Sequence, residues 1–298
     1  MPRNMTDATI HKTFKLYIDG AFPRSESGRT SAIHDPRKKS NGVPLAQVAR
    51  ASRKDLRNAV QGARGAFEGW AGAPAFLRGQ ILYRMAEMLD HRASSFADAL
   101  VRYHGATRAA AMREAEASAT RLLFYAGCCD KLAQLLGTVN PVVGPYFNFS
   151  MPEPTGVVAA LPPRMPPLLG LVSCVAPLLV PGNTVVAVVE VEAAPIALDF
   201  AEVVATSDVP KGVLQILTGD RAELVPHVAT HRDLDGTLLV TDDETERLLV
   251  ESEASDHVKR GRTIDVGTPA RWHADSSRGI EWIEPFVEIK TAWHSMGR

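Results

Sequence analysis

The segment from Glu153 to Pro195 constrains the fold more than any other part of the sequence. It contains an apolar run, Val157 to Leu161, whose length suits a buried strand. A turn with four prolines follows, and Leu168 to Leu179 is then an apolar stretch of helical length. A Gly-Asn turn leads into the β-branched run Thr184 to Val189. This order predicts a strand–helix–strand unit in a parallel sheet, and hence an α/β fold.

The flanking regions predict helices before this unit and a strand at the far end. Residues 53–136 carry apolar side chains at helical spacing, and residues 196–204 and 224–228 read as further crossover helices. Val139 to Met151 reads as a long strand, and Gly279 to His294 as a terminal strand with large aromatic side chains.

Composition excludes several partner classes. The chain has 298 residues, enough for one or two domains. Its 33 basic and 34 acidic residues form no basic patch, which argues against nucleic acid or an anionic membrane as a partner. The apolar run from Leu168 to Pro181 is too short to span a bilayer. Met1 to Lys15 lacks a secretory signal, so we expect a cytoplasmic protein.

The three cysteines are expected to fill the core. Cys128 and Cys129 are adjacent in an apolar helical stretch, and Cys174 lies inside another. A reactive thiolate needs a nearby base, cation or helix N-terminus, and none is evident in the neighbouring sequence. Their spacing matches neither a zinc site nor a disulfide framework.

Short motifs in a fixed order connect the chain to a known family. They are Glu-Pro-x-Gly-Val-Val at 153–158, Ala-Pro at 176–177, Gly-Asn-Thr-Val-Val at 182–186, Val-Pro-Lys-Gly-Val at 209–213 and Leu-Thr-Gly at 217–219. In this order and spacing the chain resembles the aldehyde dehydrogenase superfamily. The resemblance runs from Leu16 to Trp293 and so covers nearly the whole chain.

The resemblance implies a domain plan. Residues 12–136 and 152–268 would form a Rossmann-like, degenerate NAD-binding-like domain, 137–151 and 279–296 oligomerisation strands, and 269–278 a linker. Family members carry the nucleophilic cysteine on a second, catalytic domain. Only a short polar segment separates Asp265 from the terminal strand here. We therefore expect the catalytic domain to be missing.

Several positions where the family keeps working groups are changed. Met165 stands where an asparagine would donate to an oxyanion. Arg164 beside it is read as a solvated loop residue, with an anion clamp as the alternative. Val188 and Val191 stand where a lysine and a glutamate would hold the adenosine ribose. A one-residue shift would bring Glu190 or Glu192 there, but alternation along a strand would turn that side chain to the other face.

The phosphate position is altered most. Thr241 and Asp242 stand where the family has Gly-Ser at a helix N-terminus, and further carboxylates follow. Asp242 is expected to cap that helix and repel phosphate, a metal-bridged phosphate being the alternative. Asp265 stands at the position of the general-base glutamate and is expected to have a structural partner. We therefore predict no catalytic residues, bound cofactor or metal.

The terminal strand indicates a partner. An unpaired strand beside aromatic side chains is an aggregation hazard, so we expect it to be paired. Trp282, Phe286, Ile289 and Trp293 are the predicted interface residues. The chain resembles the inactive second copy of some two-copy aldehyde dehydrogenases. We expect a noncatalytic scaffold or regulatory subunit of a full-length aldehyde dehydrogenase. The alternatives are a self-associating protein, such as a homodimer, that binds another small ligand in the remodelled cleft, and an NAD-dependent aldehyde oxidoreductase.

Overall fold

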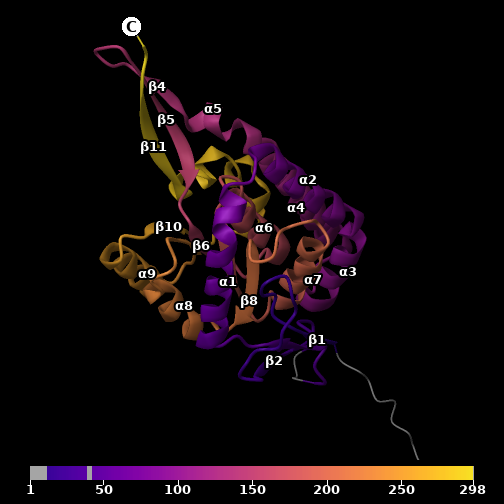
Figure 1. The fold of residues 1–298 in the computed structure, drawn as a ribbon. Coiled ribbons are helices and arrows are strands. Elements are labelled where there is room, and N and C mark those ends of the chain that lie inside the picture. Colours follow the sequence, from indigo (N-terminus) through magenta and orange to yellow (C-terminus); the bar gives the residue numbers. More distant parts are fainter. Residues whose placement is uncertain (1–11, 39–41, 298) are drawn as a thin grey trace, which may run out of the picture.

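The computed structural model describes residues 12–38 and 42–297, and its centre is a parallel sheet with helices on both faces (Figure 1). In the part of the chain described, five strands form this sheet in the order β10-β9-β6-β7-β8. The predicted α/β fold is confirmed. The residues 1–11, which include most of the segment examined for a secretory signal, lie outside the described part. The strands of this sheet are β6 (Val157–Leu161), β7 (Thr184–Glu190), β8 (Leu214–Gly219), β9 (Gly236–Val240) and β10 (Arg260–Ile264).

The helices form the outer layers. Outer helices such as α1 and α2 bury one apolar stripe, whereas every residue of α6 is buried. No helix among the described residues is long and apolar enough to cross a membrane. The helices are α1 (Arg53–Ala71), α2 (Ala75–His91), α3 (Ala93–His104), α4 (Arg108–Cys128), α5 (Leu132–Leu136), α6 (Pro167–Leu179), α7 (Ala194–Ala205), α8 (Arg221–Thr230) and α9 (Glu244–Asp256).

The alternation of strand side chains divides the core in two. On β6, Val157 and Ala159 pack with α1 and α8, whereas Val158 and Ala160 pack with α6 and α7. Helices α2, α3 and α4 lie outside α6 and α7 and belong to the second core. Burial on both faces explains why the strands are apolar throughout.

Near the N-terminus, β1 (Lys12–Phe14), β2 (Thr30–Ile33) and β3 (Ala46–Ala49) form a small sheet in the order β1-β3-β2. The chain then enters α1 through a capping box. Ser52 accepts the backbone N–H of Asp55, and the Asp55 carboxylate accepts the N–H of Ser52 at 2.8 Å. This fixes the start of the helix that covers β7 and β8.

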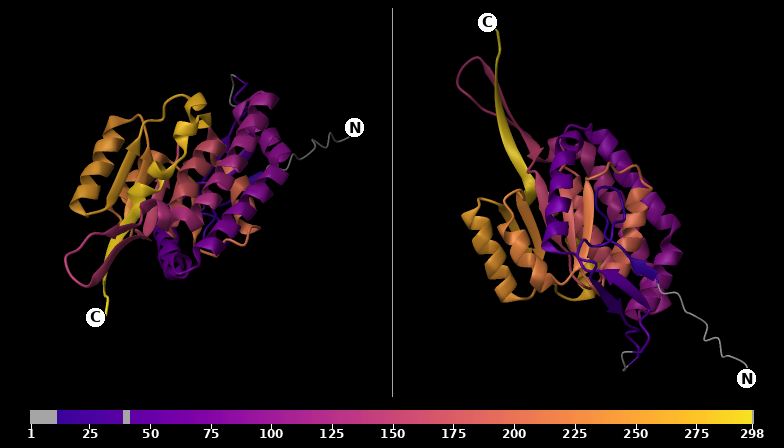
Figure 2. Two further views of the ribbon diagram at one scale, coloured as in Figure 1. Left: turned by 90° about the horizontal axis from the view of Figure 1, so that it is seen from above. Right: turned by 60° about the horizontal axis from the view of Figure 1, so that its bottom comes forward.

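A third sheet projects from the body as an arm (Figures 1 and 2). It consists of β4 (Thr138–Asn140), β5 (Tyr146–Pro154) and β11 (Val287–Ser295) in the antiparallel order β11-β5-β4. The prediction that the terminal strand begins at residue 279 is wrong, since β11 begins at Val287. The predicted long strand over 139–151 is a hairpin of β4 and β5.

Residues 265–286 fold onto the body in short 3-10 turns and do not form a free linker. Trp272, Trp282 and Phe286 are all buried in the core that contains α6 and α7. Asn183 donates to the Phe286 carbonyl at 3.0 Å. The placement of Trp282 and Phe286 on an exposed interface strand is therefore corrected: burial of their large apolar surfaces within the chain stabilises the body.

Arg121 on α4 holds this segment in place. Its buried guanidinium donates to the carbonyl oxygens of Trp272, at 2.8 Å, and Ser277, and to the Ser173 hydroxyl at 2.6 Å. A charged group is tolerated in the interior when its donors find acceptors in this way. The contact joins α4, α6 and the turns before β11.

Candidate functional site

The carboxyl ends of β6, β7 and β9 meet at a cleft of about 690 Å³. The chain passes from β6 to β7 on one side, and β9 lies on the other side of β6. Ligands of open α/β folds bind at such a reversal of strand order, outside the carboxyl ends of the strands. The cleft is therefore the candidate site suggested by the topology.

Arg221, the first residue of α8, spans this cleft. Its Nη2 donates to the Val240 carbonyl at 2.7 Å, and its Nη1 to the Pro162 carbonyl at 3.1 Å. Its Nε donates to Glu246 Oε1 at 2.6 Å. One side chain thus connects the ends of β6 and β9 with α9, and only 14% of it is exposed. The residues around Arg221 gave no sign of this role, which depends on the folding of distant strands to one edge.

A second carboxylate approaches the same guanidinium. Glu190, at the end of β7, lies with Oε1 3.7 Å from Arg221 Nη1. Burial raises the pKa of Glu190, and the positive charge of Arg221 partly opposes this. Arg164 also lines the cleft and is exposed, in agreement with the solvated-loop interpretation.

The N-terminus of α9 is capped, but by a different residue than predicted. Asp243 accepts the backbone N–H groups of Thr245 at 2.8 Å and Glu246 at 3.3 Å. Asp242, the predicted cap, instead accepts the N–H of Val266 at 2.9 Å. The sequence predicted that an aspartate carboxylate caps this helix, and this is confirmed, but the capping residue is Asp243 and not Asp242. Thr241 is buried and receives the N–H of Asp243 on its hydroxyl.

The remaining positions predicted from the family resemblance have different surroundings. Met165 lies in the loop after β6 and is 36% exposed. Val188 is buried in the core with α1 and α8, and Val191 packs at the edge of the other core. Asp265 follows β10 and receives Arg247 Nη2 at 2.6 Å. The predicted structural partner of Asp265 is confirmed.

The cysteine side chains lie away from the cleft opening. Cys129 and Cys174 are buried, and Cys128 is half-buried. Burial raises the pKa of all three thiols, that of Cys129 to about 12. They are neutral at physiological pH, as expected of core residues. Among the described residues, no group of three or more His, Cys, Asp or Glu side chains could hold a metal ion.

Unlike the polar cleft, the arm exposes large apolar side chains. Ile289 is 55% and Trp293 64% exposed on β11. The Trp293 ring packs edge-on against Tyr146 of β5, with centroids 5.9 Å apart. β11 is at the edge of its sheet, and within the described residues no strand pairs with its outer side. Contact of Ile289 and Trp293 with a partner remains a prediction.

Sequence comparison identifies the relatives. Residues 23–264 match the model of the Aldehyde dehydrogenase family. Cytosolic aldehyde dehydrogenase 1 of Elephantulus edwardii is 28% identical, over 90% of this chain and 52% of that protein. Hydroxyisobutyraldehyde dehydrogenase of Mycolicibacterium austroafricanum is 31% identical, over 78% of this chain and 45% of that protein. The chain thus spans about half the length of the curated relatives it matches.

Solved structures agree with this result. HpcC from Thermus thermophilus is similar with a TM-score of 0.79 and 26% identity, covering 85% of this chain and 48% of that one. PnpE in complex with nicotinamide adenine dinucleotide is similar with a TM-score of 0.78 and 26% identity, covering 84% and 50%. The chain therefore belongs to the aldehyde dehydrogenase family.

Proposed function

We propose that the chain is a noncatalytic, aldehyde-dehydrogenase-like subunit that serves as a scaffold or regulatory partner of a full-length aldehyde dehydrogenase. Its body, residues 12–136 and 152–268, would be a degenerate NAD-binding-like domain. The observation that carries the proposal is the internal occupation of the cleft by Arg221, which joins the strand ends across it.

Phosphate binding at this edge would need free helix donors and a positive potential. The Asp243 carboxylate already accepts two N–H groups of α9. Asp242 lines the same wall and adds negative charge, whereas Glu246 is paired with Arg221. Two unit charges about 4 Å apart repel by roughly 1–4 kcal/mol in this dielectric range, so the two aspartates disfavour a pyrophosphate at the N-terminus of α9.

The segment between β10 and β11 supports the same proposal. In the family that this chain resembles, the catalytic domain lies between these strands. Here residues 265–286 are short turns held by Arg121 and Asn183. The three cysteines are neutral core residues and offer no nucleophile.

The structure of the arm supports the proposal of a partner subunit. Its edge strand and exposed aromatic surface suit the addition of a strand from another sheet, in which backbone hydrogen bonds give affinity and side chains give specificity. At the base of the arm, Arg260 binds Glu288 at 2.6 Å. β11 is therefore held in a defined orientation before any partner arrives, which lowers the ordering cost of binding.

Calorimetric titration with NAD tests the noncatalytic part of the proposal. We expect no saturable heat. Saturable NAD binding would contradict the proposal and favour the NAD-dependent aldehyde oxidoreductase.

Co-expression with a full-length aldehyde dehydrogenase of the same organism tests the partner. We expect a mixed oligomer on size exclusion, which the double variant Ile289→Ser/Trp293→Ser should lose. Leu248→Ser is the matched control, because Leu248 is 58% exposed on α9 and away from the arm. Equal loss in the control, or a protein that never joins the dehydrogenase, would contradict the partner proposal.

A second candidate is a self-associating protein that binds another small ligand in the remodelled cleft. The volume of about 690 Å³ favours it, because small-molecule pockets lie in this range. The lining is mixed and charged, however, and includes Glu190, Glu246 and Arg221. A homodimer that ignores the dehydrogenase in co-expression would favour this candidate.

A further inference from the structure

A second hollow lies away from the strand-end cleft, between the first turns of α1 and the end of α8. This groove has a volume of about 700 Å³. The first turns of α1 contribute Arg53, Lys54 and Arg57 to it, and the chain after α8 contributes His231 and Arg232. Cationic side chains from two separate segments therefore face one space.

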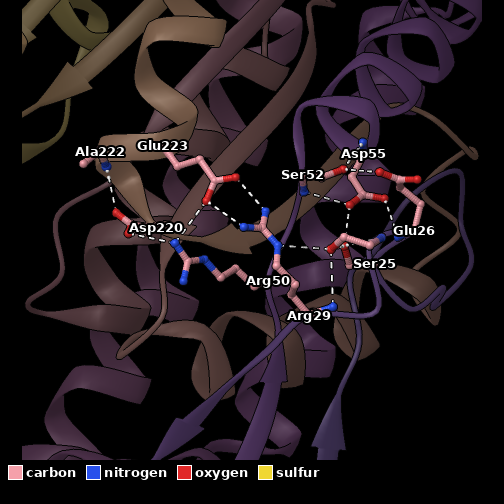
Figure 3. A network of polar contacts seen from close by, with 10 residues as sticks. Ser25, Glu26, Arg29, Arg50, Ser52, Asp55, Asp220, Ala222 and Glu223 are labelled. Atoms are coloured by element: carbon pink, nitrogen blue, oxygen red, sulfur yellow. Dashed lines mark hydrogen bonds and ion pairs between the residues drawn. The ribbon is translucent and has the colours of Figure 1, made fainter.

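The carboxylates next to this groove already have partners within the chain. Figure 3 shows the adjacent network, in which Asp55 caps α1 and receives the Ser25 hydroxyl at 2.7 Å. Glu223 binds Arg29 at 2.6 Å and Arg50 at 3.0 Å. These acids stabilise the junction of the N-terminal segment, α1 and α8, and leave little negative charge for the groove.

The groove itself has an excess of positive charge. Its Glu26 receives Lys54 at 3.4 Å and the Ser52 hydroxyl at 3.0 Å. Within the described residues, Arg53, Arg57 and Arg232 have no ion pair with a carboxylate, and Asp233 is the opposing acid. Three guanidinium groups against one carboxylate leave an excess of two positive charges. Burial lowers the pKa of His231, and the charges of Lys259 and Arg53 lower it further against the opposing effect of Asp233.

We propose that this groove binds a small phosphate-bearing anion. Guanidinium groups form paired, charge-assisted hydrogen bonds with phosphate oxygens. A phosphate group offers three acceptor oxygens and nearly two charges, so it can satisfy several of the arginines at once. The volume suits a small molecule. The site is separate from the strand-end cleft, and its test is distinct from the NAD titration, because NAD has no terminal phosphate group with three free oxygens and nearly two charges.

Calorimetric titration with inorganic pyrophosphate at about physiological ionic strength tests this site, since screening there suppresses weak surface attraction. We expect saturable binding that the double variant Arg57→Ala/Arg232→Ala weakens at least about tenfold, because each lost charge-assisted hydrogen bond contributes more than a factor of ten. The control is Arg102→Ala/Arg113→Ala, which removes two exposed arginines of α3 and α4. It should bind like the original chain.

Two further outcomes decide the assignment. Absence of saturable binding, or equal weakening in both double variants, would overturn the site in favour of general surface attraction. Citrate separates phosphate from carboxylate ligands, and citrate binding as tight as pyrophosphate would overturn the phosphate assignment. Circular dichroism and thermal melts of each variant exclude loss of folding as the cause, since all four positions are exposed.

Discussion

The strand-end cleft and the arm differ in whether their side chains have partners within the chain. In the cleft, Arg221 has acceptors from β6, β9 and α9, and Asp243 accepts the donors of its own helix. On the arm, Ile289 and Trp293 remain exposed on an edge strand. The contrast teaches that the polar groups at the carboxyl ends of the strands have partners within the chain, whereas the apolar side chains of the arm stay exposed. Residues 265–286 join the two regions.

The largest expected effect is a difference in the free energy of unfolding between substitutions of two aromatic residues, one at the base of the arm and one on its last strand. Phe286→Ala should lower the free energy of unfolding by about 3–5 kcal/mol, because it leaves a cavity at a fully buried site. Trp293→Ala should change it by no more than about 0.5 kcal/mol, since that side chain is exposed. Urea unfolding measures both. Similar losses in the two variants would break the distinction between body and arm.

The next effect tests the internal bonding of the cleft. Arg221→Met should lower the free energy of unfolding by about 1–3 kcal/mol, because it leaves Glu246 and two carbonyl groups without their donor. Arg113→Met, at an exposed position of α4, is the control and should be neutral. Urea unfolding measures both variants. If Arg221→Met unfolds like the control, Arg221 does not organise the cleft.

A smaller effect separates the two neighbouring aspartates of the cleft. Asp243→Ala should lower the free energy of unfolding by about 1 kcal/mol, the usual cost of losing a helix cap. Asp242→Ala removes a single hydrogen bond to Val266 at an exposed site and should have a smaller effect. Thermal melts rank the two variants. The reverse ranking would restore the cap to Asp242, as the sequence predicted.

The smallest effects concern pH and have opposite signs in body and arm. Burial raises the pKa of Glu114 above its ordinary value of 4.5, although its carboxylate accepts the N–H groups of Leu168 and Leu169. Its contribution to stability is therefore full below 4.5 and is lost as pH rises through the raised pKa. Stability relative to Glu114→Gln should fall as pH rises.

At the base of the arm, the hydrogen bond from Arg260 lowers the pKa of Glu288 below 4.5. Its contribution is present above 4.5 and is lost as pH falls through the lowered pKa. Stability relative to Glu288→Gln should therefore rise with pH. Urea unfolding at a series of pH values measures both slopes, and slopes of equal sign would contradict this assignment.

Local sequence predicted elements well where one physical pattern dominated. The apolar run at 157–161 and the Gly-Asn turn at 182–183 define β6 and the start of β7, because buried parallel strands need continuous apolar side chains. Core burial of Cys174 followed from its apolar neighbours. The sequence correctly predicted an aspartate cap on α9, but the cap is Asp243, one residue after the predicted position.

Tertiary contacts account for what the sequence did not predict. Trp282 and Phe286 have the same aromatic character as Trp293, and the pattern cannot tell whether such a side chain enters its own core or faces a partner. Arg221 is one more charged residue at a helix start, and its acceptors lie at Pro162 and Val240, far away in the chain. The arginines of the second groove likewise come from separate segments.

By itself, the sequence determined the parallel α/β fold and the family motifs, since these depend on side-chain type and local spacing. The tertiary structure alone decided that Arg221 spans the cleft, that Phe286 belongs to the body and that Trp293 stays exposed. The physical reason is that burial and hydrogen bonding depend on which distant segments meet, and local spacing does not contain that information.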